Sequence, residues 1–496
     1  MAIASFKPRS ALARPTPRVH LDLHTLGALV RGAGLGWAVL FVVVGLVFEL
    51  QLYGDGSIFS YAIATGETWT FHWHNIPARL FVHLLTHVPA EAYVAVTGDA
   101  GGAIALYGFL FFAAPLLGLG LTYAADRSDG ATIFTFACLS TACLCPLVFG
   151  CPTEMWIAHS AFWPAVALAH CARRDTLGAA AVLLAMLALA LSHEGGLVLA
   201  ASIAVPLLIK GPRSHPFLRA AGAFLAVLAV WAAVKVLVPP DAYYAAIIGR
   251  AAMLFIDVAA LAQPALLVPA AAVAAHLILV AALKGIAPGR AHAVSGSMVA
   301  AGLTVYWVWL DSSLHADSRY TFRTALFIGT GLLGALAGLL ARSPEQSGEP
   351  SPASFVPQKM LIARLVPWRA AAGAVVLIAL AHAVETAKYV SAWTDYKAAV
   401  RALAMGSAAD PQVGDVRFVS ADRIDKRLNL LSWFSTTPYL SVLVAPGHRP
   451  QRLVVDPNSG YYWLACETAA ASLAGPRALP QESRSLVRVY SCLHRP

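Results

Sequence analysis

The feature that most constrains this chain is a succession of long apolar runs separated by short polar breaks. Hydrophobic residues make up 58% of the sequence and charged residues only 12%, and the mean hydropathy is +0.67. Soluble domains are about half apolar and about a quarter charged. A run of about 20 apolar residues is long enough to cross the hydrocarbon core as a helix. The sequence therefore predicts an α-helical polytopic membrane protein.

The apolar runs predict about eleven transmembrane helices. Each span is expected to be helical, because lipid offers no hydrogen-bond partners to an open backbone. The spans are placed near residues 33–52, 102–123, 131–150, 156–171, 177–192, 196–209, 217–238, 262–283, 293–310, 324–341 and 369–387.

Lysine and arginine concentrate in alternate breaks, which predicts the orientation through the positive-inside rule. Residues 1–30 are basic and lack the pattern of a cleaved signal peptide, so we expect a retained cytoplasmic tail. Residues 31–388 would form the transmembrane domain, with a first outer loop at 51–100. An odd number of spans places residues 389–496 on the far side, as a periplasmic domain. The predicted location is the bacterial inner (plasma) membrane.

The polar C-terminal region, residues 389–496, has alternating segments that predict a small α/β extracytoplasmic domain. Strands are expected at 415–421, 438–445, 451–455 and 485–491, after a helical connection from the last span. Cys466 and Cys492 stand apart from the other cysteines, and a disulfide between them is expected if this domain is extracytoplasmic. The other five cysteines lie in or beside apolar spans and are interpreted as small buried residues.

Ionisable residues are concentrated in the first outer loop among aromatic side chains. Asp55 lies in a Gly-Asp-Gly sequence directly after the first span, and an amphipathic segment follows it. This placement favours a functional carboxylate, whereas an ordinary turn is the competing interpretation. His72 and His74 would point to one side of an extended segment, which suits a divalent metal. Two histidines without a third ligand do not define a metal site, so no cofactor is assigned.

Two further outer breaks carry charges close to the hydrocarbon. His193 and Glu194 lie in a tight turn, where a charged pair is costly and tends to be functional, unless both side chains reach interfacial water. Arg319 and Arg323 are four residues apart, so a helix would place them on one face, ready to bind a phosphate. Plain interfacial anchoring is the alternative for these arginines. The net charge of +9 is explained by topology and does not indicate nucleic-acid binding.

The layout resembles the integral-membrane glycosyltransferases of the GT-C class, which include protein O-mannosyltransferases and lipid A aminoarabinose transferases. The shared features are one span leading to a long outer loop, an acid near the start of that loop, and a many-span body followed by an extracytoplasmic domain. The acid lies in the segment from Tyr53 to Ala64, and only Asp55 matches the acidic position of the family. Glycine stands where many members have a second acid.

The resemblance implies a glycosyltransferase that takes a sugar from a polyprenyl-phosphate-linked donor and transfers it to an acceptor at the periplasmic face. Asp55 would be the catalytic base. The expected partners are the lipid-linked donor and membrane lipids, without nucleic acid, and the oligomeric state is left open. The residues expected to bind substrate are Glu67, His72, His74, Arg79, His193, Glu194, Arg319 and Arg323.

Three alternatives stay open at this point. The first alternative is a transporter or flippase for a lipid or an anion. That class commonly shows repeated halves, and none is evident in this sequence. The chain would otherwise be a membrane transferase of another kind, such as an acyltransferase with His193 as base. The last alternative is an assembly protein whose C-terminal domain binds a partner.

Overall fold

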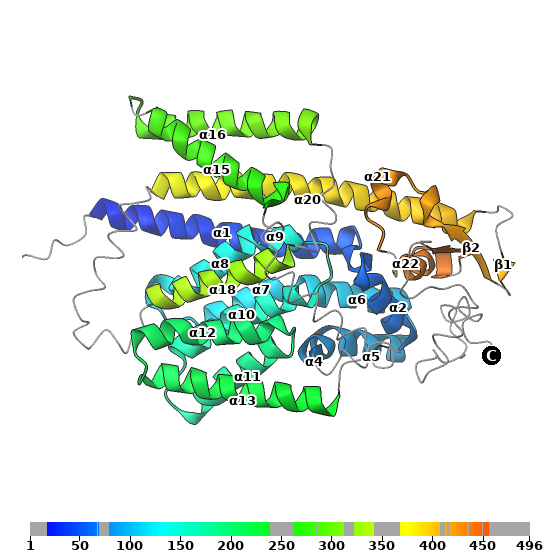
Figure 1. The fold of residues 1–496 in the computed structure, drawn as a ribbon, viewed down its shortest axis with the longest axis horizontal. Helices are drawn as coiled ribbons and strands as arrows, with labels where there is room; N and C mark the ends of the chain where they lie inside the picture. The colour runs from blue at the N-terminus through cyan, green and yellow to red at the C-terminus, as the bar shows by residue number, and fades with distance from the viewer. Residues whose placement is uncertain are drawn as a thin grey trace, which may run out of the picture.

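The computed structural model describes residues 17–66, 68, 79–238, 262–283, 285–311, 322–341, 368–406, 412–413, 416–433, 436–448 and 450–455. Long helices lie side by side along the long axis of the molecule, and the few strands gather at one end of it (Figure 1). We call this end, which also holds α2 (Asp55–Thr65), the site end of the bundle.

The main bundle is built around α10 (Glu154–Cys171), whose side chains are buried on almost every face. A helix that is apolar and buried all round belongs in a core. The helices that pack around α10 are α7 (Ala114–Ala125), α8 (Thr132–Cys143), α11 (Thr176–Ala190), α12 (Gly195–Lys210), α13 (His215–Leu237) and α18 (Arg323–Leu340). Outside them lie α1 (Pro17–Val47) and α6 (Ala100–Phe112), and the short η4 (Asp129–Ala131) and α9 (Cys145–Val148) flank α8.

Seven helices in the described residues are long and apolar enough to cross a membrane, or eight if α6 and α7 form one span bent by 43°. Pro115 at the start of α7 accounts for this break, because proline cannot continue the hydrogen-bond ladder of the preceding helix. Three shorter apolar helices accompany them, namely Thr176–Ala190, Gly195–Lys210 and Leu266–Ala282. The chain is therefore a multi-pass helical membrane protein. Every predicted span coincides with a helix or a broken pair of helices.

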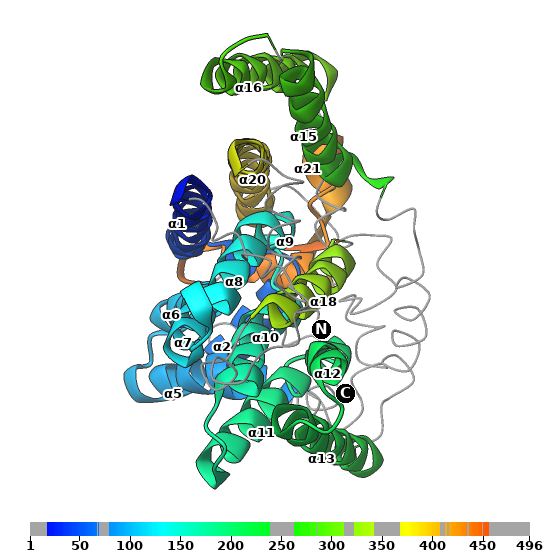
Figure 2. The ribbon, with the colours of Figure 1, turned by 90° about the vertical axis from the view of Figure 1, so that its left-hand side faces the viewer.

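A pair of helices, α15 (Pro264–Ala282) and α16 (Pro288–Val305), packs on α20 (Trp368–Met405) and stands away from the rest of the bundle (Figure 2). Ala272, Val299, Leu303 and Leu377 form a small core of their own there. The Ser295 hydroxyl lies 2.9 Å from Nδ1 of His276, which joins α15 to α16 by a polar contact. The π-helical turn η6 (Tyr306–Leu310) follows α16.

The first outer loop, predicted at 51–100, is more helical than the sequence indicates. The short η1 (Leu50–Leu52) leads into α2, and α4 (Leu80–Val82), η3 (His83–His87) and α5 (Val88–Thr97) form one further helical segment. Residues Leu80–Thr97 are even long and apolar enough to count among the seven candidate spans. Because of its histidines, this segment reads as a polar loop in the sequence. In the structure His83 and His87 stack on each other, and His87 is buried against Phe59.

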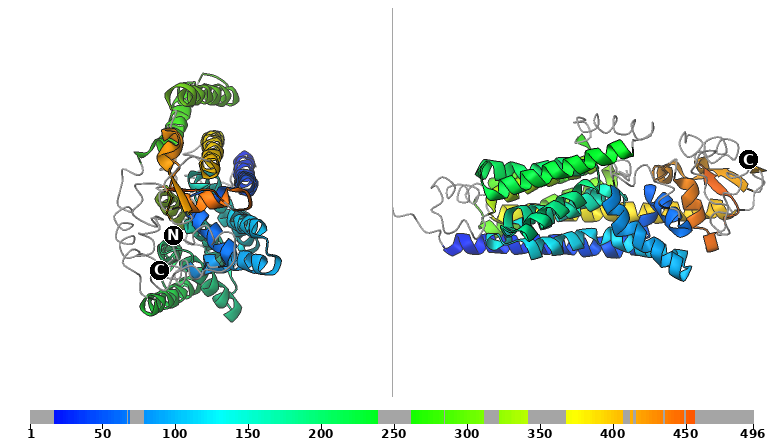
Figure 3. Two further views of the ribbon diagram at one scale, coloured as in Figure 1. Left: turned by 90° about the vertical axis from the view of Figure 1, so that its right-hand side faces the viewer. Right: turned by 90° about the horizontal axis from the view of Figure 1, so that it is seen from below.

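The C-terminal elements lie at the site end, beside α2 (Figure 3). α20 runs for 38 residues and unites the last predicted span with the helical segment after it. Beyond it, β1 (Gln412–Val413) pairs antiparallel with β2 (Val416–Ser420), which pairs parallel with β3 (Leu453–Val455). The connection from β2 to β3 contains η8 (Ala421–Arg423), α21 (Lys426–Asn429), α22 (Thr437–Leu443) and η9 (Pro446–His448).

Two of the four predicted C-terminal strands are present, as β2 and β3. The strand predicted at 438–445 is wrong, because this segment forms α22. Pro438 stands at the first turn, where its fixed φ favours a helix, and residues 437–443 are buried on all sides. Such complete burial removes the polar face by which helix and strand periodicity are distinguished. The strand predicted at 485–491 and both Cys466 and Cys492 lie outside the described residues.

Candidate functional site

Asp55 is the first residue of α2, at the site end of the bundle. Glycine is required on both sides of Asp55, for a different structural reason at each position. Gly54 has φ 56° and ψ −134°, which only glycine adopts without strain, and a Cβ there would lie 3.1 Å from the Trp433 ring. A Cβ on Gly56 would lie 2.0 Å from the Gln51 carbonyl oxygen. Neither neighbour of Asp55 therefore accepts a side chain.

Arg79 joins two carboxylates that come from different helices. Its guanidinium contacts Glu154, the first residue of α10, and its other terminal nitrogen lies 3.9 Å from Glu194 Oε2. The Phe81 backbone N–H donates to the Leu191 carbonyl at 3.1 Å, which holds the Arg79 segment against the end of α11. The arginine thus crosslinks the segment before α4, α10 and the turn between α11 and α12.

His193 and Glu194 form that turn, and both are only partly exposed. The Gly195 backbone N–H donates to His193 Nδ1 at 3.0 Å. Burial lowers the pKa of His193, so the ring is neutral near pH 7. Burial acts to raise the pKa of Glu194, but Arg79, His193 and Lys235 hold it below its ordinary value. Lys235, near the end of α13, lies 3.7 Å from Glu194 Oε1.

The pKa of Asp55 is raised to about 6. Burial is the largest cause, and the negative charge of Glu154 adds to it, whereas Arg79 and Arg323 act in the opposite direction. Arg323 is the first residue of α18. Glu154 of α10, Arg323 of α18 and Arg79 are thus close enough to the start of α2 to act on the charge of Asp55. We call the following seven residues the ionic cluster: Asp55, Arg79, Glu154, His193, Glu194, Lys235 and Arg323.

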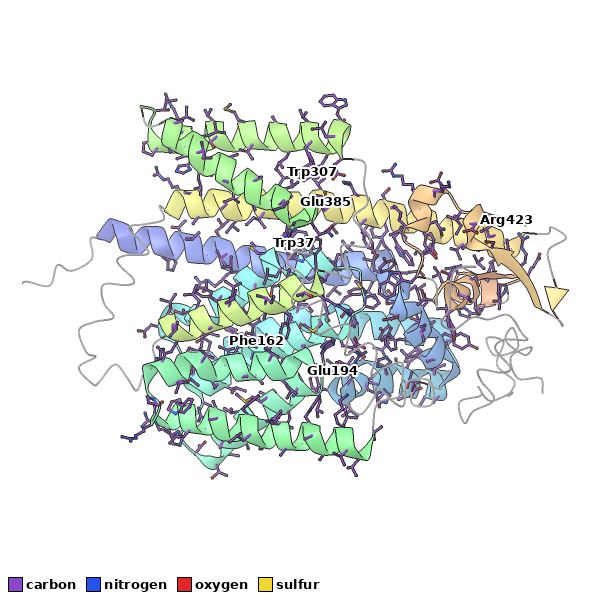
Figure 4. All side chains as sticks on the ribbon, viewed as in Figure 1. Trp37, Phe162, Glu194, Trp307, Glu385 and Arg423 are labelled. Carbon is purple, nitrogen blue, oxygen red and sulfur yellow. The ribbon has the colours of Figure 1, made fainter. Side chains whose placement is uncertain are left out.

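The ionic cluster combines three carboxylates with three cations at the end of an apolar bundle. Figure 4 shows Glu194 where the helices of the bundle meet the region of α2 and α4. The carboxylate of Glu194 is 22% exposed and that of Glu154 13%, so neither is fully solvated. Charges this close to an apolar environment are costly and mark functional sites more often than stabilising ones. Chemically, the cluster offers one carboxylate of raised pKa beside guanidinium and ammonium groups suited to an anion.

The structure brings together five of the residues that the sequence selects, namely Asp55, Arg79, His193, Glu194 and Arg323. Four others lie outside the described residues: Glu67, His72, His74 and Arg319.

Glu154 and Lys235 are not among the site residues predicted from the sequence. Glu154 follows the capping residue Thr153, where acids commonly stabilise a helix start, and Lys235 ends an apolar run like an ordinary interfacial anchor.

The described part of the chain contains no group of three or more histidine, cysteine, aspartate or glutamate side chains arranged to hold a metal ion. The pair proposed from the sequence, His72 and His74, lies outside this part of the chain. A divalent metal therefore stays an expectation from the sequence.

A second polar group lies on the outlying helices, apart from the ionic cluster. The Trp307 indole N–H donates to Glu385 Oε1 at 2.7 Å (Figure 4). Lys388 Nζ lies 3.4 Å from both Glu385 and Asp311. These contacts join η6, together with Asp311 directly after it, to α20. Each carboxylate has a cation beside it, so this group serves to fix the outlying pair of helices on the bundle.

No protein-family model matches this chain. A comparison with curated proteins gives no match either. The functional assignment therefore rests on the ionic cluster and its surroundings.

Proposed function

We propose that this chain is a membrane glycosyltransferase of the GT-C type, which transfers a sugar from a polyprenyl-phosphate-linked donor to an acceptor. In this proposal about eleven helices span the bacterial inner membrane, counting the shorter and bent ones. The N-terminus is cytoplasmic, and residues 389–496 form a periplasmic domain. The site end of the bundle then faces the periplasm.

One arrangement supports the proposal: the carboxylate that begins α2 is buried and lies within electrostatic reach of Arg79 and Arg323, and its pKa is raised to about 6. At neutral pH such a group is mostly ionised, yet it is a stronger base than an ordinary aspartate. It is therefore suited to accept the proton of an acceptor hydroxyl as the sugar is transferred. The reaction breaks the bond between the sugar and the carrier phosphate and forms a bond between the sugar and that hydroxyl oxygen.

The cations of the ionic cluster supply the second requirement of this reaction. A departing phosphate is already a weak base, so it needs charge stabilisation more than protonation. Arg323 lies close enough to interact with both Asp55 and His193. Arg79 is held between Glu154 and Glu194, which fixes the position of its guanidinium group. Arg79 and Arg323 then define the anion site.

The glycines beside Asp55 explain how this chain departs from the pattern of GT-C enzymes with two adjacent acids. Neither Gly54 nor Gly56 has room for a side chain. The second carboxylate of the site comes instead from Glu154, ninety-nine positions later in the chain, which acts on the pKa of Asp55. The proposed site therefore has two acids whose chemistry differs, because Glu154 contacts Arg79 and Asp55 is the one with the raised pKa.

A transporter or flippase for a lipid or an anion is the second candidate. The observation in its favour is the balance of three acids and three cations, since paired charges inside membrane proteins also form ion and proton pathways.

The deciding experiment compares Asp55→Asn with Asp395→Asn in purified protein given a radiolabelled polyprenyl-phosphate sugar and an acceptor. Asp395 is exposed on α20 and undergoes the same chemical change. Loss of the base should lower transfer by about 10²–10⁴-fold, and the control should retain full activity. Undiminished transfer by Asp55→Asn would overturn the assignment. Movement of the intact donor across vesicle membranes without sugar transfer would establish the second candidate instead.

A further inference from the structure

An apolar groove lies between α7, α10 and α11, on the side of the bundle next to the ionic cluster. Its volume is about 530 Å³. The helices α7 and α10 form its floor, and they approach so closely that a Cβ on Gly118 would lie 2.4 Å from the Ser160 carbonyl oxygen. On the α11 side the lining residues are the alanines 181, 185 and 188, whose small side chains leave the space open.

Each of three walls of the groove has a lining residue that lies close in sequence to a residue of the ionic cluster. Phe81 lines it two residues after Arg79. Ile157 lines it three residues after Glu154, which is about one helical turn. On the third wall, Ala188 lines the groove six residues before Glu194.

The hydrogen bond from the Phe81 N–H to the Leu191 carbonyl joins the first of these walls to the third. The end of the groove that is lined by Phe81, Ile157 and Ala188 is therefore the end nearest to the charged residues.

The lining is suited to a hydrocarbon chain and to little else. Its one hydroxyl-bearing side chain is Ser160, and that hydroxyl donates to the Trp156 carbonyl of its own helix at 2.9 Å. The groove extends along α10 from Ile157 to Leu168, a rise of about 16 Å. This is about half of the roughly 30 Å hydrocarbon core, measured from the charged end.

From this arrangement we infer that the groove binds the proximal part of the hydrocarbon chain of the donor lipid, with its phosphate at the ionic cluster. The inference rests on the proposed function, because that function supplies a donor with a phosphate and a long chain. It goes further by assigning the chain to α7, α10 and α11. An ordinary phospholipid would satisfy the apolar walls equally well, but it would not be displaced selectively by the donor.

The test uses a polyprenyl-phosphate sugar that carries a photoactivatable diazirine on an isoprene unit near the phosphate. Labelled peptides should come from α7, α10 and α11, and unlabelled polyprenyl phosphate should compete with the label. Ala185→Phe fills the groove, whereas Leu184→Phe adds a ring at a neighbouring position that is 65% exposed and does not line it. We expect Ala185→Phe to lower labelling and raise the donor KM by at least about 10-fold with kcat unchanged, and Leu184→Phe to change neither.

A second groove variant, Ala181→Phe, keeps the test valid if Ala185→Phe fails to fold. Labelling on other helices, or labelling that neither groove variant reduces, would overturn the inference. Equal labelling by a phospholipid probe that the donor does not displace would overturn it as well, by showing ordinary lipid in the groove.

The two proposals fail in distinguishable ways. Asp55→Asn should abolish transfer and leave groove labelling intact, because the substitution does not touch the groove. Sugar transfer accompanied by labelling elsewhere would reject the groove and retain the function. Competed groove labelling in a wild-type protein that transfers no sugar would reject the function and retain the groove.

Discussion

The Trp433 indole N–H donates a hydrogen bond to the Tyr53 hydroxyl at 3.1 Å, and the rings of the two residues meet edge to face. Tyr53 precedes the Gly54–Asp55 pair, and its ring also packs against Tyr389 and Trp393 of α20. The segment between β2 and β3 is therefore fixed on the loop from which α2 begins. Because Asp55 is the first residue of α2, we expect Trp433 to position Asp55 through Tyr53 and Gly54.

Removing the Trp433 ring should therefore change both the rate and the pH dependence of transfer. We expect Trp433→Ala to lower kcat by about 10-fold and to shift the acid midpoint of the rate downward, because Asp55 becomes better solvated. Trp433→Phe keeps an aromatic ring but loses the indole N–H and its hydrogen bond, which costs about 1 kcal/mol. It should retain most of the rate. The control is Trp309→Ala, since Trp309 is 75% exposed. A pH profile unaltered by Trp433→Ala would limit Trp433 to a structural role.

The glycines beside Asp55 provide a prediction on stability. Gly54→Ala places a residue with a side chain in a backbone conformation that costs about 1–3 kcal/mol. The added methyl group also lies against the Trp433 ring. Thermal unfolding in detergent should show a lowered midpoint for Gly54→Ala and for Gly56→Ala, with loss of transfer. Gly36→Ala is the matched control, because nothing lies within 4 Å of the added methyl group and alanine favours a helix interior. Wild-type stability in Gly54→Ala would show that this turn is not rigid.

The helices could be predicted from the sequence because an apolar run of sufficient length leaves a chain in lipid no other regular structure. The segment predicted as a strand, α22, is seven residues long and buried on all sides, so no periodicity distinguished it from a strand. The site could be predicted only where an unusual residue stood in an unusual place, as Asp55 and Glu194 do. Nothing in the sequence pairs Glu154 with Arg79, because that contact joins residues 75 positions apart. Lys235 looks like an ordinary interfacial anchor.

The raised pKa of Asp55 predicts the pH dependence of transfer. The base acts in its ionised form, so kcat/KM should rise as the pH passes through about 6 and remain level above it. Glu154→Gln removes a negative charge that raises this pKa, and it should move the midpoint to lower pH. A midpoint near the ordinary aspartate value of about 4 in the wild-type protein would contradict the burial of Asp55 in the active state.

The raised pKa of Asp55 also affects the stability of the protein. Stability should fall as the pH rises, whereas activity should increase. The pKa of Asp55 is higher in the folded protein than its ordinary value of 3.8, so folding favours the protonated form. The free energy of unfolding should therefore fall as the pH rises from about 4 to about 6, by at most about 3 kcal/mol. Asp55→Asn carries no charge and should escape this loss. We expect it to unfold at a higher temperature than wild type at pH 7.5 and at an equal temperature at pH 4. A lower midpoint at pH 7.5 would show that ionised Asp55 is stabilised by its neighbours by more than burial costs it.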